Sequence, residues 1–222
     1  MAARHALRLG GWLALPVATT SLGAIAGPIP ALIGLTGGFL ALLYGALWLP
    51  RAAHSAFDRG RHRAARRRYR LLGATAVSAV RERAALLSRI GCLVAEHRAD
   101  AAEQLLARID VADLDAAERA VWLNNRACLA IERDPAAALA LIEEASALRP
   151  DVAAVQHTRA QALLGVGRLD EAIAVLDALR SPDLPRALEA DRCRDLARAW
   201  ERKGQPEYAA DYAARAQLMS AP

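Results

Sequence analysis

The first fifty residues of this 222-residue chain contain no acidic side chain, and Leu9 to Leu49 contain no charged side chain at all. A helix on the surface of a soluble protein normally shows a polar face, so this stretch does not fit an ordinary surface helix. Lysine is also scarce, since Lys203 is the single one among 29 basic residues. Together with the abundant alanine, this preference for arginine indicates the coding bias of a GC-rich, bacterial genome.

Cysteine is scarce, and the motifs of enzymes and metal sites are missing. Cys92, Cys128 and Cys193 lie 36 and 65 residues apart, a spacing that fits neither a zinc site nor a disulfide framework. The five histidines are scattered and form no H-E-x-x-H motif, and the chain has no G-x-S-x-G or Walker motif. We therefore expect three buried thiols in a reducing compartment, no catalytic or metal site, and no cofactor.

The uncharged stretch is too long for one membrane crossing. A single helix of 41 residues would extend about 60 Å, twice the ~30 Å hydrocarbon core of a bilayer. Gly27-Pro28-Ile29-Pro30 is the expected break, because proline lacks an N–H donor and disfavours helix in the residue before it. The two parts, Leu9–Ala26 and Ile29–Leu49, would each cover roughly one bilayer. Residues 1–50 therefore predict a transmembrane helical hairpin.

Small residues and tryptophans support a tight hairpin. The pattern G-x-x-x-G, which lets helices approach closely in lipid, occurs on each side of the bend. The four helix-packing glycines are Gly23, Gly27, Gly34 and Gly38. Trp12 and Trp48 lie at the far ends of the two parts, so both would reach the same membrane interface, where tryptophan is favoured.

The net charge of +5 is unevenly distributed along the chain. Residues 1–50 carry +2, the basic juxtamembrane segment 51–70 carries +7, and residues 71–222 carry −4. Arginines near a membrane segment stay in the cytoplasm, so we expect the inner membrane with the following domain on the cytoplasmic side. The segment either attracts anionic lipid or serves only as a topology signal. Nucleic acid is not expected as a partner, because this segment has few aromatic side chains on which bases could stack. They are Phe57 and Tyr69.

A cleaved signal peptide is the alternative for the first residues. Arg4 and Arg8 resemble the basic start of such a peptide, and Ala24-Ile-Ala26 resembles its cleavage site. Even then, Ile29–Leu49 would span the membrane and the basic segment would hold the rest of the chain in the cytoplasm.

From Leu71 onward the sequence predicts helices whose punctuation repeats. Two sets of residues share separations of 7, 5 and 7: Ala160, Gly167, Ala172 and Leu179, then Ala197, Gly204, Ala209 and Ala216. A third set has a turn shortened by one residue and is followed by Pro150: Ala127, Ala138 and Ala145. Ala102 and Ile109 form a fainter first unit.

This pattern resembles the tetratricopeptide repeat, a family of 34-residue helix–turn–helix units with small residues at the helix crossing and glycine in the turn. The resemblance implies an all-α fold, in which the hairpin precedes an α-solenoid over residues 71–222. It predicts helix pairs at 76–98/100–109, 117–132/135–148, 153–165/169–180 and 187–203/206–219. Val155, Ala162 and Leu163 are expected in the core.

The resemblance also implies a concave groove, lined by the first helix of each pair, for another protein or a peptide. The candidates by repeat register are Asn124, Asn125, Cys128, His157, Thr158, Gln161, Arg194, Asp195 and Arg198. No lysine stands where some members of the family hold a terminal carboxylate, so that ligand is not predicted. The alternative for each candidate is an ordinary solvated helix residue.

These features predict a membrane-anchored adaptor that presents a cytoplasmic protein-binding groove. The alternative is a structural subunit of a membrane complex, in which the glycine-rich hairpin makes the main contacts. A repeat protein on the outer side of the membrane would require the +7 segment to cross it. Ala216, Leu218 and Met219 suggest that the last helix is partly uncovered, where a second copy of the chain could dock.

Overall fold

The computed structural model describes residues 28–182 and 184–220, and every regular element within these ranges is a helix. The chain divides into two compact units. One contains the residues up to Phe57 together with His62–Cys92, and the other contains Asp58–Arg61 and the residues from Leu93 onward. We describe each unit by itself.

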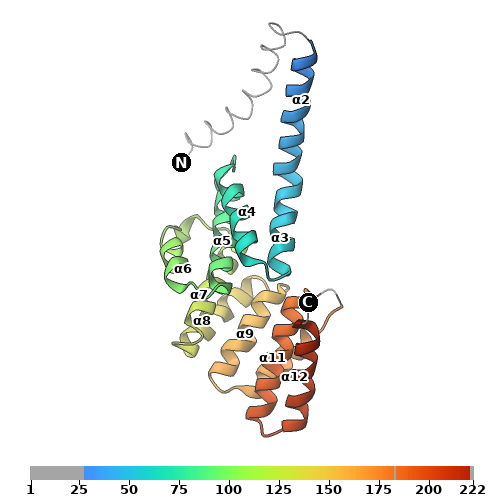
Figure 1. Ribbon diagram of the computed structural model, residues 1–222. Coiled ribbons are helices and arrows are strands. Elements are labelled where there is room, and N and C mark those ends of the chain that lie inside the picture. The colour runs from blue at the N-terminus through green and yellow to red at the C-terminus, as the bar shows by residue number, and fades with distance from the viewer. Residues whose placement is uncertain (1–27, 183, 221–222) are drawn as a thin grey trace. The chain divides into compact units, whose positions relative to one another are not determined.

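The first unit begins with a long helical segment. Helix α2 (Pro28–Leu43) leads directly into the π-helix η1 (Tyr44–Trp48) and then α3 (Leu49–Asp58), and the three form one rod in Figure 1. Pro28 and Pro30 lie in the first turn of α2, where a missing N–H breaks no helical hydrogen bond. The backbone N–H of Leu49 donates to Tyr44 O, which is the wider i→i−5 bond of a π-helix.

Large apolar side chains cover the outside of α2 and η1. Ile29, Ile33 and Trp48 are each about 70% exposed, at 71%, 68% and 69%. Leu32, Phe39 and Leu40 are exposed as well. Burial begins at Leu49 and continues with Ala53 and Ala56 on α3. An apolar surface of this extent is unusual on a protein exposed to water.

The transmembrane hairpin expected for residues 1–50 falls partly outside the described chain. Its first part, Leu9–Ala26, lies outside the described residues, as do Gly23 and Gly27. In the part that is described, no single helix has both the length and the apolar character needed to cross a membrane. Gly34 and Gly38 lie one turn apart on α2.

The basic segment 51–70 is helical and has a small core of its own. It forms α3 and α4 (His62–Ala74), whose Ala53, Ala65 and Tyr69 pack with Cys92 of α5 (Ala79–Ala95). The Tyr69 hydroxyl lies 2.8 Å from His54 Nδ1, and Arg68 donates to the carbonyl of Ala52. Most of the arginines in this segment point outward.

The second unit consists of consecutive antiparallel helix pairs (Figure 1). After α6 (Ala99–Leu106) and the short η2 (Val111–Asp113), the helices are α7 (Ala116–Ala130), α8 (Pro135–Leu148), α9 (Ala153–Gly165), α10 (Leu169–Ala178), α11 (Arg186–Arg202) and α12 (Pro206–Ser220). The predicted helix pairs from residue 117 onward agree with these bounds within two residues. The first predicted pair is longer at both ends than α5 and α6.

Alanine is buried where the helices cross, as the repeat pattern predicted. One core cluster contains Leu123, Ala127, Ala138 and Ile142, and a second contains Ala160, Leu163, Ala172 and Leu196. Val155, Ala162 and Leu163 are all buried, which confirms the core predicted for α9. A methyl side chain lets two helix backbones approach closely, and larger side chains fill the space on either side.

Three of the turns share one geometry. His97, Gly167 and Gly204 have φ angles of 55°, 82° and 72°, in the left-handed region. In each turn, the backbone N–H of the residue that follows the left-handed one donates to a carbonyl five positions back. For example, the N–H of Arg168 donates to the carbonyl of Leu163. This is the Schellman motif, which satisfies carbonyl groups left over at the end of a helix.

The turn between α7 and α8 is built differently, as its shorter spacing indicated. The Asp134 carboxylate accepts a hydrogen bond from the backbone N–H of Ala137 and caps α8, and Pro135 occupies the first helical position. The end of α9 approaches this start closely, because a Cβ placed on Gly165 would lie only 2.6 Å from Cβ of Pro135. This contact requires glycine.

Candidate functional site

The polar residues predicted for a groove form contacts from one helix pair to the next. Asp195 of α11 is buried and faces two side chains of α9. Its Oδ2 lies 3.0 Å from His157 Nε2 and accepts a hydrogen bond of 2.9 Å from Gln161 Nε2. Arg198, one turn along α11, places a guanidinium nitrogen 3.0 Å from Oδ1.

A smaller version of this contact joins α7 to α9. The Thr158 hydroxyl of α9 is buried and lies 3.4 Å from the Cys128 thiol of α7. It also donates to the carbonyl of Ala154 in its own helix. Thr158 therefore holds, one repeat earlier, the place that Asp195 holds on α11.

The repeat register relates these positions along the whole array. One line is buried: Asn125, Thr158 and Asp195. The residues one position before the first line and three positions after it form a second and a third line: Asn124, His157 and Arg194, then Cys128, Gln161 and Arg198. Thr158 contacts Cys128, and Asp195 contacts His157 and Gln161, so these two residues of the first line meet the preceding helix pair.

The environment of Asp195 keeps its carboxylate ionised. Burial by itself would raise the pKa of Asp195, but His157, Arg198 and Gln161 together hold it below its ordinary value. Burial raises the pKa of the Cys128 thiol, and its hydrogen bond with Thr158 opposes that effect only in part. A thiol of this kind is a poor nucleophile, since the thiolate is the reactive form.

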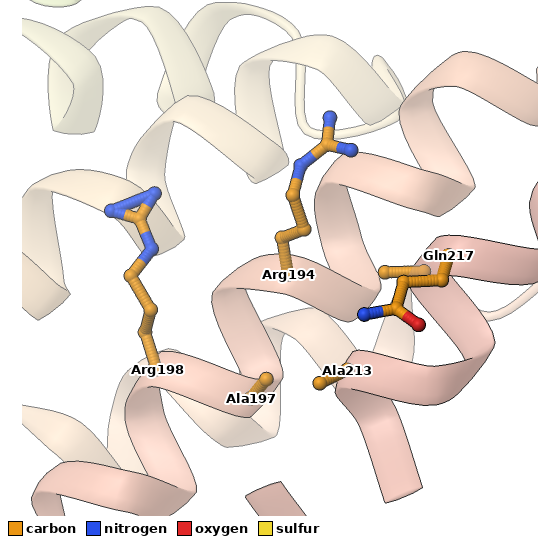
Figure 2. Close-up of a pocket in the computed structure, with 6 residues that line it drawn as sticks. Arg194, Ala197, Arg198, Ala213 and Gln217 are labelled. Carbon is orange, nitrogen blue, oxygen red and sulfur yellow. The ribbon is translucent and has the colours of Figure 1, made fainter. Parts of the chain in front are cut away.

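The array ends in a shallow pocket between α11 and α12. Its volume is about 330 Å³, and it is lined by Arg194, Ala197, Arg198, Ala213, Ala216 and Gln217. In Figure 2 the two arginines extend from α11 on one side, and Gln217 stands on α12 across from them. Small apolar side chains thus lie between long polar ones.

The comparisons with known proteins agree with this architecture. Residues 129–190, from the end of α7 to the start of α11, match a family model described as tetratricopeptide repeat. The helix pairs resemble tetratricopeptide repeats. Among solved structures, the chain is similar to a tetratricopeptide repeat protein from Parabacteroides merdae, with 16% identity and a TM-score of 0.54. That match covers 95% of this chain and 79% of the other, and at this identity it shows the fold alone. No curated protein matches the chain.

The tetratricopeptide-like array divides the predicted groove residues into two groups. Asn125, His157, Thr158 and Asp195 are buried. The others are half-buried or exposed, and Arg194 and Arg198 are the most accessible: Asn124, Cys128, Gln161, Arg194 and Arg198. Contact of these residues with a partner stays a prediction.

Ala216 was expected on a partly uncovered last helix, but the α12 side of the pocket was not part of the predicted groove. Ala213 and Gln217 were not candidates, because the predicted groove was confined to first helices. The repeat register could have identified this side, because it places Ala213 at the position that Leu176 holds one repeat earlier. Across the described ranges, no group of three histidine, cysteine or acidic residues is arranged to hold a metal ion.

Proposed function

We propose that this chain is a scaffold that binds another protein through its helical repeats and is attached to a membrane by its apolar N-terminal segment. The observation that carries the first part is the stack of helix pairs α7–α12, whose first helices present polar side chains at the same register in successive repeats. Asn124, Gln161, Arg194 and Arg198 are the proposed partner contacts. The buried residues next to them hold the helices in place.

The contacts of Asp195 with His157 and Gln161 support this role because they make the surface rigid. A binding surface loses less conformational entropy on association when its side chains are already ordered. Asp195, His157 and Gln161 order neighbouring first helices relative to one another. The exposed residues of the same lines are therefore presented at fixed spacing.

Site-specific photo-crosslinking in the full chain tests the binding surface. A photo-reactive amino acid at Asn124, Gln161 or Arg194 should capture one defined partner in cells. The matched control is the same amino acid at Ala136, an exposed position on the second helix α8. Equal labelling from Ala136 and from the first-helix positions, or no product from any of them, would refute the proposed surface.

The membrane attachment is supported by exposure and charge. Ile29, Leu32, Ile33 and Phe39 are exposed on α2, and the uncharged sequence before them continues this apolar character. The arginines that follow, including Arg51 and Arg63, point outward where they can meet lipid head groups. We place the protein at the inner membrane, with its repeats in the cytoplasm.

Reporter fusions to the C-terminus test this placement. We expect fluorescence from a fused fluorescent protein and no activity from a fused alkaline phosphatase, with the protein in a membrane fraction that resists alkaline carbonate. An active phosphatase fusion would contradict the orientation. Release of the protein by carbonate would contradict the attachment itself.

The second candidate is a structural subunit whose apolar helix makes the main contacts within a membrane complex. Gly34 and Gly38 lie one turn apart on α2, which is the spacing of a close helix contact. Leucine at both positions should then abolish assembly on native gels. Gly37→Leu is the control, since a Cβ at Gly37 meets nothing within 4 Å. Unchanged assembly of the double variant would favour the scaffold.

A further inference from the structure

The pocket between α11 and α12 corresponds to an occupied site one repeat earlier. Helix α11 packs against both α9 and α10, in the same way that α9 packs against α7 and α8. The matching surface on α11 and α12 is the pocket lined by Arg194, Ala197 and Arg198 from one helix and Ala213 from the other (Figure 2). The geometry of the repeat therefore provides a seat for one more helix.

The occupied site shows what kind of side chain this position receives. On α9, His157 and Gln161 meet the buried carboxylate of Asp195, and Ala160 lies between them in the core. The residues at the same register on α11 are Arg194, Arg198 and Ala197. The apolar centre is kept, while a histidine and an amide are replaced by two permanently charged guanidinium groups.

These replacements strengthen the preference for an acid. Arg194 pairs with Asp191 and Arg198 with Asp195, each three residues earlier on the same helix. A guanidinium has five N–H donors, so each arginine can hold a second carboxylate without releasing the first. The arginine side chains are 52% and 68% exposed, and are accessible to a ligand.

We propose that the pocket between α11 and α12 binds an amphipathic helix of a partner protein, and that Arg194 and Arg198 capture an aspartate or glutamate on that helix. The inference rests on the proposed role in protein binding and specifies the chemistry of the partner. The small floor formed by Ala197, Ala213 and Ala216 admits a helix at close range, and the arginines determine its charge and register.

A second position refines the motif of the partner. Leu164 of α9 has Glu201 as its register equivalent on α11, and Glu201 is exposed. At the occupied site, Arg202 lies seven residues after Asp195 and donates to the carbonyl of Leu164. The partner helix should therefore carry an acid followed, two turns later, by an arginine or lysine that donates to the backbone carbonyl of Glu201.

A synthetic peptide based on the sequence of α11 is a direct probe. It spans residues 186–202 and keeps Ala190, Asp195, Leu196, Ala199 and Arg202. Glutamine replaces its other arginines, alanine replaces its cysteine, and a lactam on its outer face locks the helix. Binding of the fluorescein-labelled peptide to the full chain is measured by anisotropy. We expect saturable binding that is at least ten-fold weaker when asparagine replaces the aspartate at position 195 of the peptide.

Variants of the full chain complete the test. Arg194→Gln should weaken binding at least ten-fold, and so should Ala213→Gln, which fills the floor of the pocket. Arg215→Gln is the matched control: Arg215 is 48% exposed and pairs with Asp211 on α12, but it does not line the pocket. The Arg215→Gln variant should bind the peptide as tightly as the wild-type chain does. Circular dichroism should show that all three variants are folded.

Three results would overturn the inference. They are equal affinity for the aspartate and asparagine peptides, insensitivity to Arg194→Gln, and self-association of the chain that Arg194→Gln abolishes. The last result would assign the pocket to a second copy. Crosslinking from Asn124 or Gln161 alongside any of these would leave the proposed scaffold intact and remove only the acidic-helix site.

Discussion

Asp195 illustrates how one buried carboxylate joins two repeats. Its side chain is 2% exposed, and taking a charge out of water costs several kcal/mol unless partners compensate. Here His157, Gln161 and Arg198 supply those partners from two helices. Removing the carboxylate while the partners remain should cost more than losing any exposed ion pair.

We predict that Asp195→Asn lowers the free energy of unfolding by about 1–3 kcal/mol, since the change keeps the shape and removes charge-assisted hydrogen bonds. Urea unfolding followed by circular dichroism measures the change. The control is Asp191→Asn on the same helix, whose exposed pairing with Arg194 should contribute less than about 1 kcal/mol. Similar losses in both variants would show that the buried contacts of Asp195 have no special role.

The same carboxylate predicts a pH dependence. Because the pKa of Asp195 is lowered in the folded state, its contribution is complete above the ordinary aspartate pKa of about 3.9. It is lost as the pH falls through the folded value. The stability difference between wild type and Asp195→Asn should therefore shrink below about pH 4. A difference that grew toward low pH would contradict this assignment.

At the scale of elements, the turns show how strictly the repeat controls the backbone. Gly167 and Gly204 occupy the left-handed region without steric cost. His97 occupies the same place in the turn between α5 and α6, five residues before Ala102, and its turn has the same two backbone hydrogen bonds. The fold thus imposes a left-handed conformation on a residue whose side chain disfavours it.

We predict that His97→Gly stabilises the protein by about 1 kcal/mol, because a non-glycine residue in this region carries a penalty of that size. The reverse change, Gly204→Ala, should destabilise it by a similar amount. Thermal unfolding of the two variants measures both changes in stability. His97→Ala should not stabilise the protein. If His97→Gly were no more stable than His97→Ala, the left-handed strain at this turn would be refuted.

At the scale of the whole molecule, stability in the described array comes from contacts between neighbouring repeats. Each helix pair buries its apolar side chains against the next pair, so the array behaves as a row of coupled units. Leu163 of α9, Leu176 of α10 and Leu196 of α11 are all fully buried in one cluster. No single pair could cover these side chains alone.

We predict that deleting residues 186–222 destabilises the remaining repeats by at least about 3 kcal/mol. The reason is that Leu163 and Leu176 become exposed, and burying a leucine is worth roughly 1.5–3 kcal/mol. The urea midpoint of the truncated protein should fall clearly below that of the full chain. An unchanged midpoint would mean that the repeats fold independently of the last pair.

Much of the helical array was predictable, because its signals are local. The spacing of alanines at the crossings, glycines in the turns and proline at a helix start located α7–α12 within two residues. The α5–α6 pair was less accurate, since its turn has histidine in place of glycine. The helices of segment 51–70 were not predicted, because its arginines suggested charge rather than the buried face formed by Ala53, Ala65 and Tyr69.

The candidate site was only half predictable. Register alone selected His157, Gln161, Asp195 and Arg198 as groove candidates on successive first helices. It could not show that Asp195 points inward to α9 while Arg194 points outward, because that depends on how each helix is rotated against its neighbours. The pocket also needed α12, which lies beside α11 only after the chain has turned back.

The sequence by itself determined the helices, their turns and the uneven distribution of charge, since these depend on residues a few positions apart. Only the tertiary structure decided which polar side chains are buried between repeats and which line an open pocket. Burial depends on residues some thirty positions apart being brought together by packing. The same side-chain chemistry therefore forms an internal contact at Asp195 and an exposed surface at Arg194.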